Sequence, residues 1–156
     1  MRYIHKFLGS IKRITTPMLI LIVLLVIAIL IRANLTNLIN FTNYYHYFEQ
    51  VTVSRVVDGD TIELQSGERV RFVGIDAPEF GEVGFHEARI FVVEKISQNR
   101  GVVYLQQSGN DTDHFGRLRR YVWLSIPQNS NNPVERRNLL LNQILLDTGH
   151  AVIWGN

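Results

Sequence analysis

The chain has 156 residues, 46% of them apolar and none of them cysteine, which suits one ordinary domain with an appendage and excludes a disulfide scaffold or a thiolate-bound metal. Its net charge of +2 is unevenly divided, because residues 1–33 carry five basic residues and no acid. The other 11 of the 16 basic residues, set against 14 acidic ones, leave −3 for the rest. That part has no overall positive field for nucleic acid, so phosphate recognition there must be local.

The N-terminal segment predicts a membrane-spanning helix over residues 14–31. Every residue from Pro17 to Ile31 is apolar, and such a run has the length and composition of a single-pass span. Four basic residues precede it, which predicts a cytoplasmic N-terminus and a domain displayed outside. A cleaved signal peptide, giving a secreted protein, is the alternative, but Ile31-Arg32-Ala33 makes a poor cleavage site.

Residues 34–48 are predicted to form a connector. Asparagines alternate there with leucine, isoleucine and phenylalanine, and tyrosines follow. Aromatic residues next to a span often settle among lipid headgroups, so both an interfacial segment and a plain tether remain open. The expected organisation is therefore a basic tail and anchor over 1–33, a connector over 34–48 and a globular domain over 49–156.

The globular part reads as about five short strands and two helices. Period-2 and short apolar runs predict strands near 51–57, 60–65, 70–75, 102–105 and 121–124, with a brief closing strand at 150–154. Helical spacing of apolar residues predicts helices over 84–97 and 134–148, and residues 106–113 read as a polar loop. This outline is that of a small barrel carrying helices, an α+β fold.

Two carboxylates are expected to meet at one end of the first hairpin. Ser66-Gly67 marks the turn between two strand patterns, which pairs position 60 with roughly position 73 and brings Asp60 and Asp76 to the same mouth. A cation is needed to hold two carboxylates together. Oxygen ligands without Cys or His indicate Ca²⁺ or Mg²⁺, and the carbonyl of Ala77, restricted by Pro78, is a third candidate ligand. An ordinary turn and an ordinary strand exit are the structural alternative.

The neighbours of this pair indicate phosphate chemistry. Glu79 is placed to orient or deprotonate a water, and Arg71 on the strand leading to the site suggests an anionic substrate. Strict alternation puts Arg71 and Asp76 on opposite faces of the strand, so a bend is required, and we predict it at Gly74.

A glycine turn at residues 113–117 is the second candidate part of the site. It is predicted to project Arg117 over a neighbouring mouth, with His114 in reach of a phosphate. Arg119 and Arg120 follow closely, and for these two we favour a solvated strand edge that discourages further pairing.

Together these residues resemble the staphylococcal nuclease-like (thermonuclease) family of OB-fold nucleases. The resemblance covers residues 51 to about 153 and rests on five ordered motifs: Val57-Asp-Gly-Asp-Thr61, Arg71-Phe-Val-Gly-Ile-Asp-Ala-Pro-Glu79, Phe85-His-Glu-Ala88, Thr112-Asp-His-Phe-Gly-Arg117 and Leu141-Asn142 through Gly149-His-Ala151. It implies a five-stranded OB-fold barrel with two helices, here behind one N-terminal transmembrane helix.

The resemblance also implies roles. It assigns Ca²⁺ to Asp60, Asp76 and the carbonyl of Ala77, the attacking water to Glu79, and charge neutralisation to Arg71 and Arg117. The family cleaves DNA and RNA and leaves 3′-phosphates.

The sequence departs from the family pattern in four places. Ala77 and Phe115 stand where threonine and tyrosine are common, the segment between Glu79 and Phe85 is shorter, and the chain stops at Asn156. We expect Phe115 to border the substrate without the hydroxyl contact.

We therefore expect a monomeric, membrane-anchored, outward-facing, calcium-dependent endonuclease that needs no protein partner. A catalytically inactive OB-fold module that binds nucleic acid or a partner protein at the membrane surface is the alternative. A purely structural membrane protein would leave the clustered carboxylates unexplained.

Overall fold

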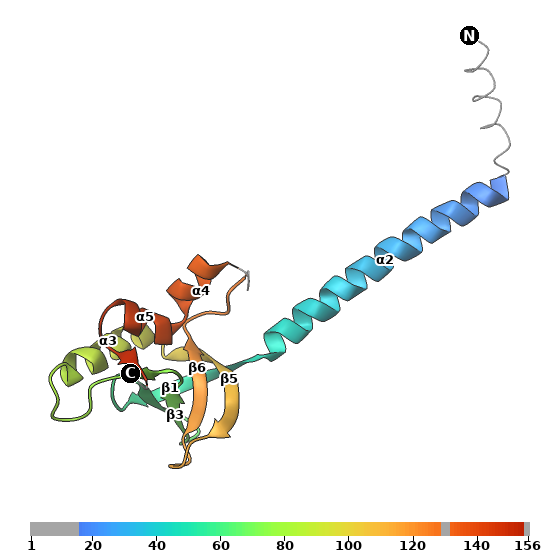
Figure 1. Ribbon diagram of the computed structural model, residues 1–156. Helices are drawn as coiled ribbons and strands as arrows, with labels where there is room; N and C mark the ends of the chain where they lie inside the picture. The colour runs from blue at the N-terminus through green and yellow to red at the C-terminus, as the bar shows by residue number, and fades with distance from the viewer. Residues whose placement is uncertain (1–15, 129–131, 155–156) are drawn as a thin grey trace, which may run out of the picture. The chain divides into compact units, whose positions relative to one another are not determined.

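The computed structural model describes residues 16–128 and 132–154, and they fall into two compact units that meet between Tyr44 and Tyr45 (Figure 1). The described residues of the first unit, 16–44, all lie in helix α2 (Thr16–His46), whose last two residues belong to the second unit. The stretch of α2 from Pro17 to Tyr44 is long and apolar enough to cross a membrane. Signal sequences also have this length and composition. The residues predicted as the start of the span, 14 and 15, lie outside the described part of the chain.

Helix α2 runs through most of the segment predicted as a connector. Residues 34–46 are helical, and only Tyr47 separates the helix from the first strand, which begins at Phe48. The sequence left both an interfacial segment and a plain tether open here, and asparagine and threonine are poor helix formers. In the structure the hydroxyls of Thr36 and Thr42 instead donate to carbonyls one turn earlier in the helix.

The second unit is built on a closed five-stranded barrel, which confirms the predicted architecture. Its strands lie in the order β1-β2-β3-β6-β5, with β3 and β6 parallel and the other neighbours antiparallel. The barrel strands are β1 (Phe48–Val56), β2 (Thr61–Leu64), β3 (Arg69–Phe72), β5 (Val102–Thr112) and β6 (Leu118–Trp123). Two short strands, β4 (Ile75–Asp76) and β7 (Val152–Ile153), pair with each other beside the barrel.

The β2–β3 hairpin forms as predicted, with a small correction to its register. The turn lies at residues 65–67, where the amide of Gly67 donates to the carbonyl of Leu64. Thr61 pairs with Arg71, and the carbonyl of Asp60 accepts from the amide of Phe72, so position 60 meets 72 and not 73.

Strand β5 is longer than its sequence suggested. Residues 106–112, predicted as a polar loop, continue the strand and pair with β6 as a hairpin. This end of β5 is mostly exposed, so polar residues are tolerated there. For that reason no apolar pattern in the sequence indicates a strand. The hairpin carries the 113–117 turn at its tip.

Three helices accompany the barrel: α3 (Phe85–Gln98), α4 (Pro133–Leu139) and α5 (Leu141–Asp147). The first matches its prediction. The second predicted helix, 134–148, is divided at Leu140, whose extended backbone (φ −82°, ψ 107°) forms a bridge with Trp123 of β6. Pairing with a barrel strand therefore overrides local helix propensity at this residue.

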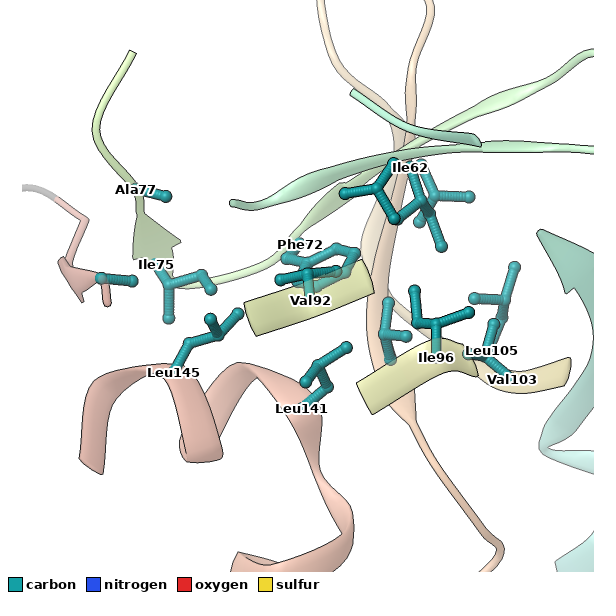
Figure 2. Close-up of a cluster of buried hydrophobic side chains, with 14 of the residues drawn as sticks. Ile62, Phe72, Ile75, Ala77, Val92, Ile96, Val103, Leu105, Leu141 and Leu145 are labelled. Atoms are coloured by element: carbon teal, nitrogen blue, oxygen red, sulfur yellow. The ribbon is translucent and has the colours of Figure 1, made fainter. Parts of the chain in front are cut away.

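The core lies where the barrel meets α3 and α5 (Figure 2). Ile62 and Phe72 from the barrel pack with Val92 of α3 and with Leu141 and Leu145 of α5, and each of these side chains is almost fully buried. Because apolar burial is the main source of stability, this cluster fixes the barrel wall that carries β3 and the bend after it.

Candidate active site

Gly59 allows the loop before β2 to pack closely against Ala77 and α3. A Cβ at residue 59 would lie 2.6 Å from the Cβ of Ala77 and 2.8 Å from that of Ala88. No other residue fits this gap without movement of the backbone. The contact sets Asp60 against the backbone of Ala77, whose amide donates to Asp60 Oδ2 at 2.7 Å.

Arg71 joins the two predicted metal-ligating carboxylates. Its Nη1 lies 2.8 Å from Asp60 Oδ2, and its Nη2 donates to Asp76 Oδ1 at 2.6 Å. The same guanidinium donates to the carbonyl of Ile75 at 2.9 Å. Asp60 and Asp76 thus come together at one guanidinium of the chain itself; the divalent cation expected between them stays a prediction.

The bend that permits this arrangement lies at the predicted residue. β3 ends at Phe72 and β4 starts at Ile75, with Gly74 between them at φ +76°. Side chains with a Cβ rarely adopt this backbone conformation. The bend turns Asp76 back to the face from which Arg71 projects.

Burial raises the pKa of Asp60 from 3.8 to about 7, although the Arg71 guanidinium and the Ala77 amide act in the opposite direction. The nearby Asp58 adds to the rise. Loss of hydration thus outweighs the neighbouring guanidinium, and further positive charge at this carboxyl would favour its ionised form. Within residues 16–128 and 132–154, no group of three or more acidic or histidine side chains lies close enough to hold a metal ion. The oxygen donors near the bend, two carboxylates beside a backbone segment, suit a hard cation that completes its shell with backbone and water oxygens.

Glu79 follows the proline and is exposed. Its amide donates to Glu82 Oε2 at 2.8 Å, which fixes its backbone. None of the described residues donates to its carboxylate, and it is not joined to the Arg71 cluster. Glu79 thus follows Asp76 by three residues in the sequence, but its side chain is open to solvent.

Arg117 is held by the turn that the sequence predicted. Asp113 Oδ1 accepts from the amides of Phe115 and Arg117, both at 2.9 Å, and Asp113 Oδ2 accepts from Arg117 Nε at 2.7 Å. Burial alone would raise the pKa of Asp113, but these hydrogen bonds from Arg117 and Phe115 outweigh it and lower that pKa below 3.8. The guanidinium of Arg117 lies over the Phe115 ring, 5.2 Å from its centre.

A cavity of about 490 Å³ connects the two parts of the site. Arg71 and Gly74 line it from the β3–β4 bend, and His114, Phe115 and Arg117 line it from the hairpin tip. The sequence-predicted residues Arg71, Arg117, His114 and Phe115 are thus brought to one cavity. Asp60, Asp76, Ala77 and Glu79 do not line it.

Two residues that the sequence did not assign to the site, Arg119 and Trp154, also line the cavity. Arg119 and Arg120 were predicted to form a solvated edge, and this is wrong: Arg119 borders the cavity, and Arg120 is only 8% exposed and pairs with Asp111 at 2.6 Å. Trp154 is 65% exposed, and its amide donates to the carbonyl of Gly74 at 3.1 Å. The register of β6 on β3 would have identified Arg119, because it pairs with Arg71.

The barrel and this grouping of acids, arginines and aromatic rings define a nuclease-like protein of the OB type. Over 126 residues the chain is 32% identical to the thermonuclease of Staphylococcus intermedius, and the match covers 72% of the chain and 71% of that protein. The chain belongs to the thermonuclease family.

A second relative is the Escherichia coli protein ParB, 33% identical over 102 residues. That match covers 64% of the chain and 54% of ParB, so the chain spans about half the length of this relative. No family model matches the sequence.

Proposed function

We propose that the chain is a calcium-dependent nuclease, anchored in a membrane with its barrel outside the cell, that hydrolyses phosphodiester bonds in DNA and RNA. The observation that carries the proposal is the pair of ion contacts through which Arg71 holds Asp60 and Asp76 together. Membership of the thermonuclease family supports it. The 3′-phosphate product is taken from the family resemblance.

The arginines have an electrostatic role. Hydrolysis of a phosphodiester builds negative charge on the phosphate oxygens, and the protein contributes mainly by positioning groups that meet this charge. Arg71 is 14% exposed and Arg117 is 26% exposed in their side chains, and both are anchored by carboxylates. Their guanidiniums are therefore held in place before the substrate arrives.

Glu79 orients or deprotonates the attacking water. Its carboxylate is exposed and its backbone is fixed by Glu82, which leaves the side chain available to a solvent molecule. A positioned general base contributes about 10²- to 10⁴-fold in rate.

Calcium would be held by the carboxylates of Asp60 and Asp76 and the carbonyl of Ala77. When bound, it would supply positive charge that polarises the phosphate and lowers the pKa of water. The Nη1 and Nη2 atoms of Arg71 already face the two carboxylates. With calcium bound to these acids, Arg71 would divide its hydrogen bonds between the acids and the substrate.

The membrane anchor is proposed from α2 and from the charge around it. The apolar stretch Pro17–Tyr44 satisfies the length and composition of a span, and four basic residues precede it. Basic residues favour the cytoplasmic side. Cleavage of the same segment as a signal sequence would instead release the nuclease, and the mass of the chain recovered from cells separates the two.

An inactive module that binds nucleic acid or a partner protein is the second candidate. One observation favours it: the Arg71 guanidinium already donates to two carboxylates and two backbone carbonyls. A guanidinium so engaged contributes to catalysis only if the cation or the substrate takes over some of these contacts.

Nicking of supercoiled plasmid by the full-length chain in detergent micelles tests the proposal. We expect nicking with Ca²⁺, none with EDTA, and 5′-hydroxyl and 3′-phosphate ends. Arg71→Ala should abolish nicking, whereas Arg55→Gln, which removes an equal charge from exposed β1, should not. Binding of DNA without any nicking in Ca²⁺ would favour the inactive module.

A further inference from the structure

Three arginines share the cavity between the β3–β4 bend and the hairpin tip. Arg71, Arg117 and Arg119 all line it, together with Phe115 and Trp154. The backbone explains their grouping. Arg71 and Arg119 are register partners on the parallel strands β3 and β6, and Arg117 lies two residues before Arg119. Register partners point to the same face of a sheet, and Arg117 reaches the cavity from the turn directly before β6.

The three guanidiniums differ in how their charge is balanced. Arg71 contacts two carboxylates and Arg117 contacts one. For Arg119 no carboxylate lies within ion-pair distance among the described residues, although its backbone carbonyl accepts from Arg120. Its side chain is half-buried at the cavity wall. Arg119 thus leaves an uncompensated positive charge facing a space large enough for part of a nucleotide.

The spacing of Arg117 and Arg119 suits two anions. Arg119 is the second residue of β6 and Arg117 directly precedes the strand, so their backbones lie at most about 7 Å apart, the span of two extended residues. Successive phosphate charges of one nucleic-acid strand advance by about 3.4 Å along the axis of a double helix, and by more where the strand is extended. A strand with one phosphate at Arg71 and Arg117 can therefore place its neighbouring phosphate at Arg119.

We propose that Arg119 binds the phosphate next to the one that is cleaved, and so sets a preference for substrates with two consecutive phosphates. The inference rests on the proposed function, because it takes the cleaved phosphate to lie at Arg71 and Arg117. Phe115 and Trp154, both largely exposed, offer faces on which the intervening base stacks. Arg119 is a specificity-determining residue in this scheme and contacts no reacting atom.

Binding of three dithymidylates tests this: TpT with a single phosphodiester, pTpT with an added 5′-phosphate, and TpTp with an added 3′-phosphate. The full-length chain in detergent is titrated in EDTA, so that no hydrolysis occurs, and Kd is measured by calorimetry. We expect one of the two doubly phosphorylated ligands to bind more tightly than TpT. Arg119→Gln should remove that advantage, about tenfold for one charge-assisted contact, and leave TpT unchanged.

Two further measurements separate this role from a structural one. Arg119→Lys should keep part of the advantage, and Arg55→Gln, the matched loss of one charge outside the cavity, should keep all of it. For oligothymidylate, the slope of log Kd against log salt should fall by about 0.7 in Arg119→Gln, the value for one phosphate contact on a single strand.

The outcomes distinguish this inference from the proposed function. Equal weakening of all three ligands by Arg119→Gln, or no weakening of any, would overturn the role of Arg119 but not the proposed function, which plasmid nicking by the wild-type chain tests. A wild-type chain that neither nicks plasmid nor binds any of the three ligands would overturn both proposals.

Discussion

Arg71 Nη2 donates to Asp76 Oδ1 at 2.6 Å, although five residues of a strand would normally separate these side chains onto opposite faces. The contact exists because the backbone turns at Gly74, φ +76°. Asn142 supports the turn from α5: its buried amide donates to the carbonyl of Val73 at 2.8 Å, and its oxygen accepts from the amide of Val122 at 2.9 Å. The position of the acids thus depends on a backbone conformation as much as on the acids themselves.

Gly74→Ala should therefore impair both stability and hydrolysis. A Cβ at residue 74 meets nothing within 4 Å, so its cost is backbone strain alone, about 1–2 kcal/mol. Relief of that strain would move Asp76 away from Arg71. Urea unfolding measures the first effect and plasmid nicking the second.

Gly67→Ala is the matched control for this substitution. Gly67 has φ +91° and open space around it, but lies in the β2–β3 turn. It should lose similar stability without losing activity. Full activity in Gly74→Ala would show that the bend does not position the acid.

The stability of the metal-free protein should fall as pH rises from 3.8 to about 7 because of Asp60. Its pKa is raised in the folded state, so the folded chain retains a proton that the unfolded chain has already lost in this range. Asp60→Asn should remove this part of the pH dependence. Thermal unfolding in EDTA across the range measures it, and parallel curves for the two proteins would contradict the assignment.

Calcium should stabilise the chain more at high pH than at low pH. Binding requires the ionised form of Asp60, so the proton held there competes with the metal until pH exceeds about 7. The increase in melting temperature on adding Ca²⁺ measures this effect. A pH-independent increase would indicate that calcium binds elsewhere.

Glu79→Gln should lower hydrolysis by about 10²- to 10⁴-fold and leave DNA binding intact. The carboxylate is exposed and makes no contact on which the fold depends, so the loss should appear in the single-turnover rate constant and not in the melting temperature. Glu94→Gln, an exposed glutamate on α3, serves as the control. Unchanged turnover in Glu79→Gln would refute its role as the base.

Substitutions of Asp113 should separate the turn from the ion pair. Asp113→Asn keeps an oxygen for the amides of Phe115 and Arg117 but loses the charge that holds the guanidinium, so activity should fall and stability should fall only by the contribution of that charge. Asp113→Ala also removes the turn and should cost about 1 kcal/mol of unfolding free energy more. Equal activity in Asp113→Asn and wild type would show that the ion pair does not position Arg117.

The same carboxylate gives a pH dependence of opposite sign to that of Asp60. The pKa of Asp113 is lowered in the folded state, so its contribution to stability is present above 3.8 and is lost as pH falls through the lower value. Asp113→Asn should therefore flatten the acid limb of the stability curve.

Much of the local structure of this protein could be predicted from short stretches of its sequence. The glycine turn at residues 65–67, helix α3, the bend at Gly74 and the 113–117 turn were all predicted, because each depends on residues close together in the chain. The apolar run in α2 and the alternation in the barrel strands are likewise readable without any partner.

Tertiary contacts decided the rest. The extended break at Leu140 comes from pairing with Trp123, and the strand character of residues 106–112 comes from pairing with β6. Arg119 lines the cavity and Arg120 is buried. This difference comes from the parallel register of β6 on β3. Each of these pairings joins two separate segments of the chain, and no local propensity encodes which strand will lie alongside.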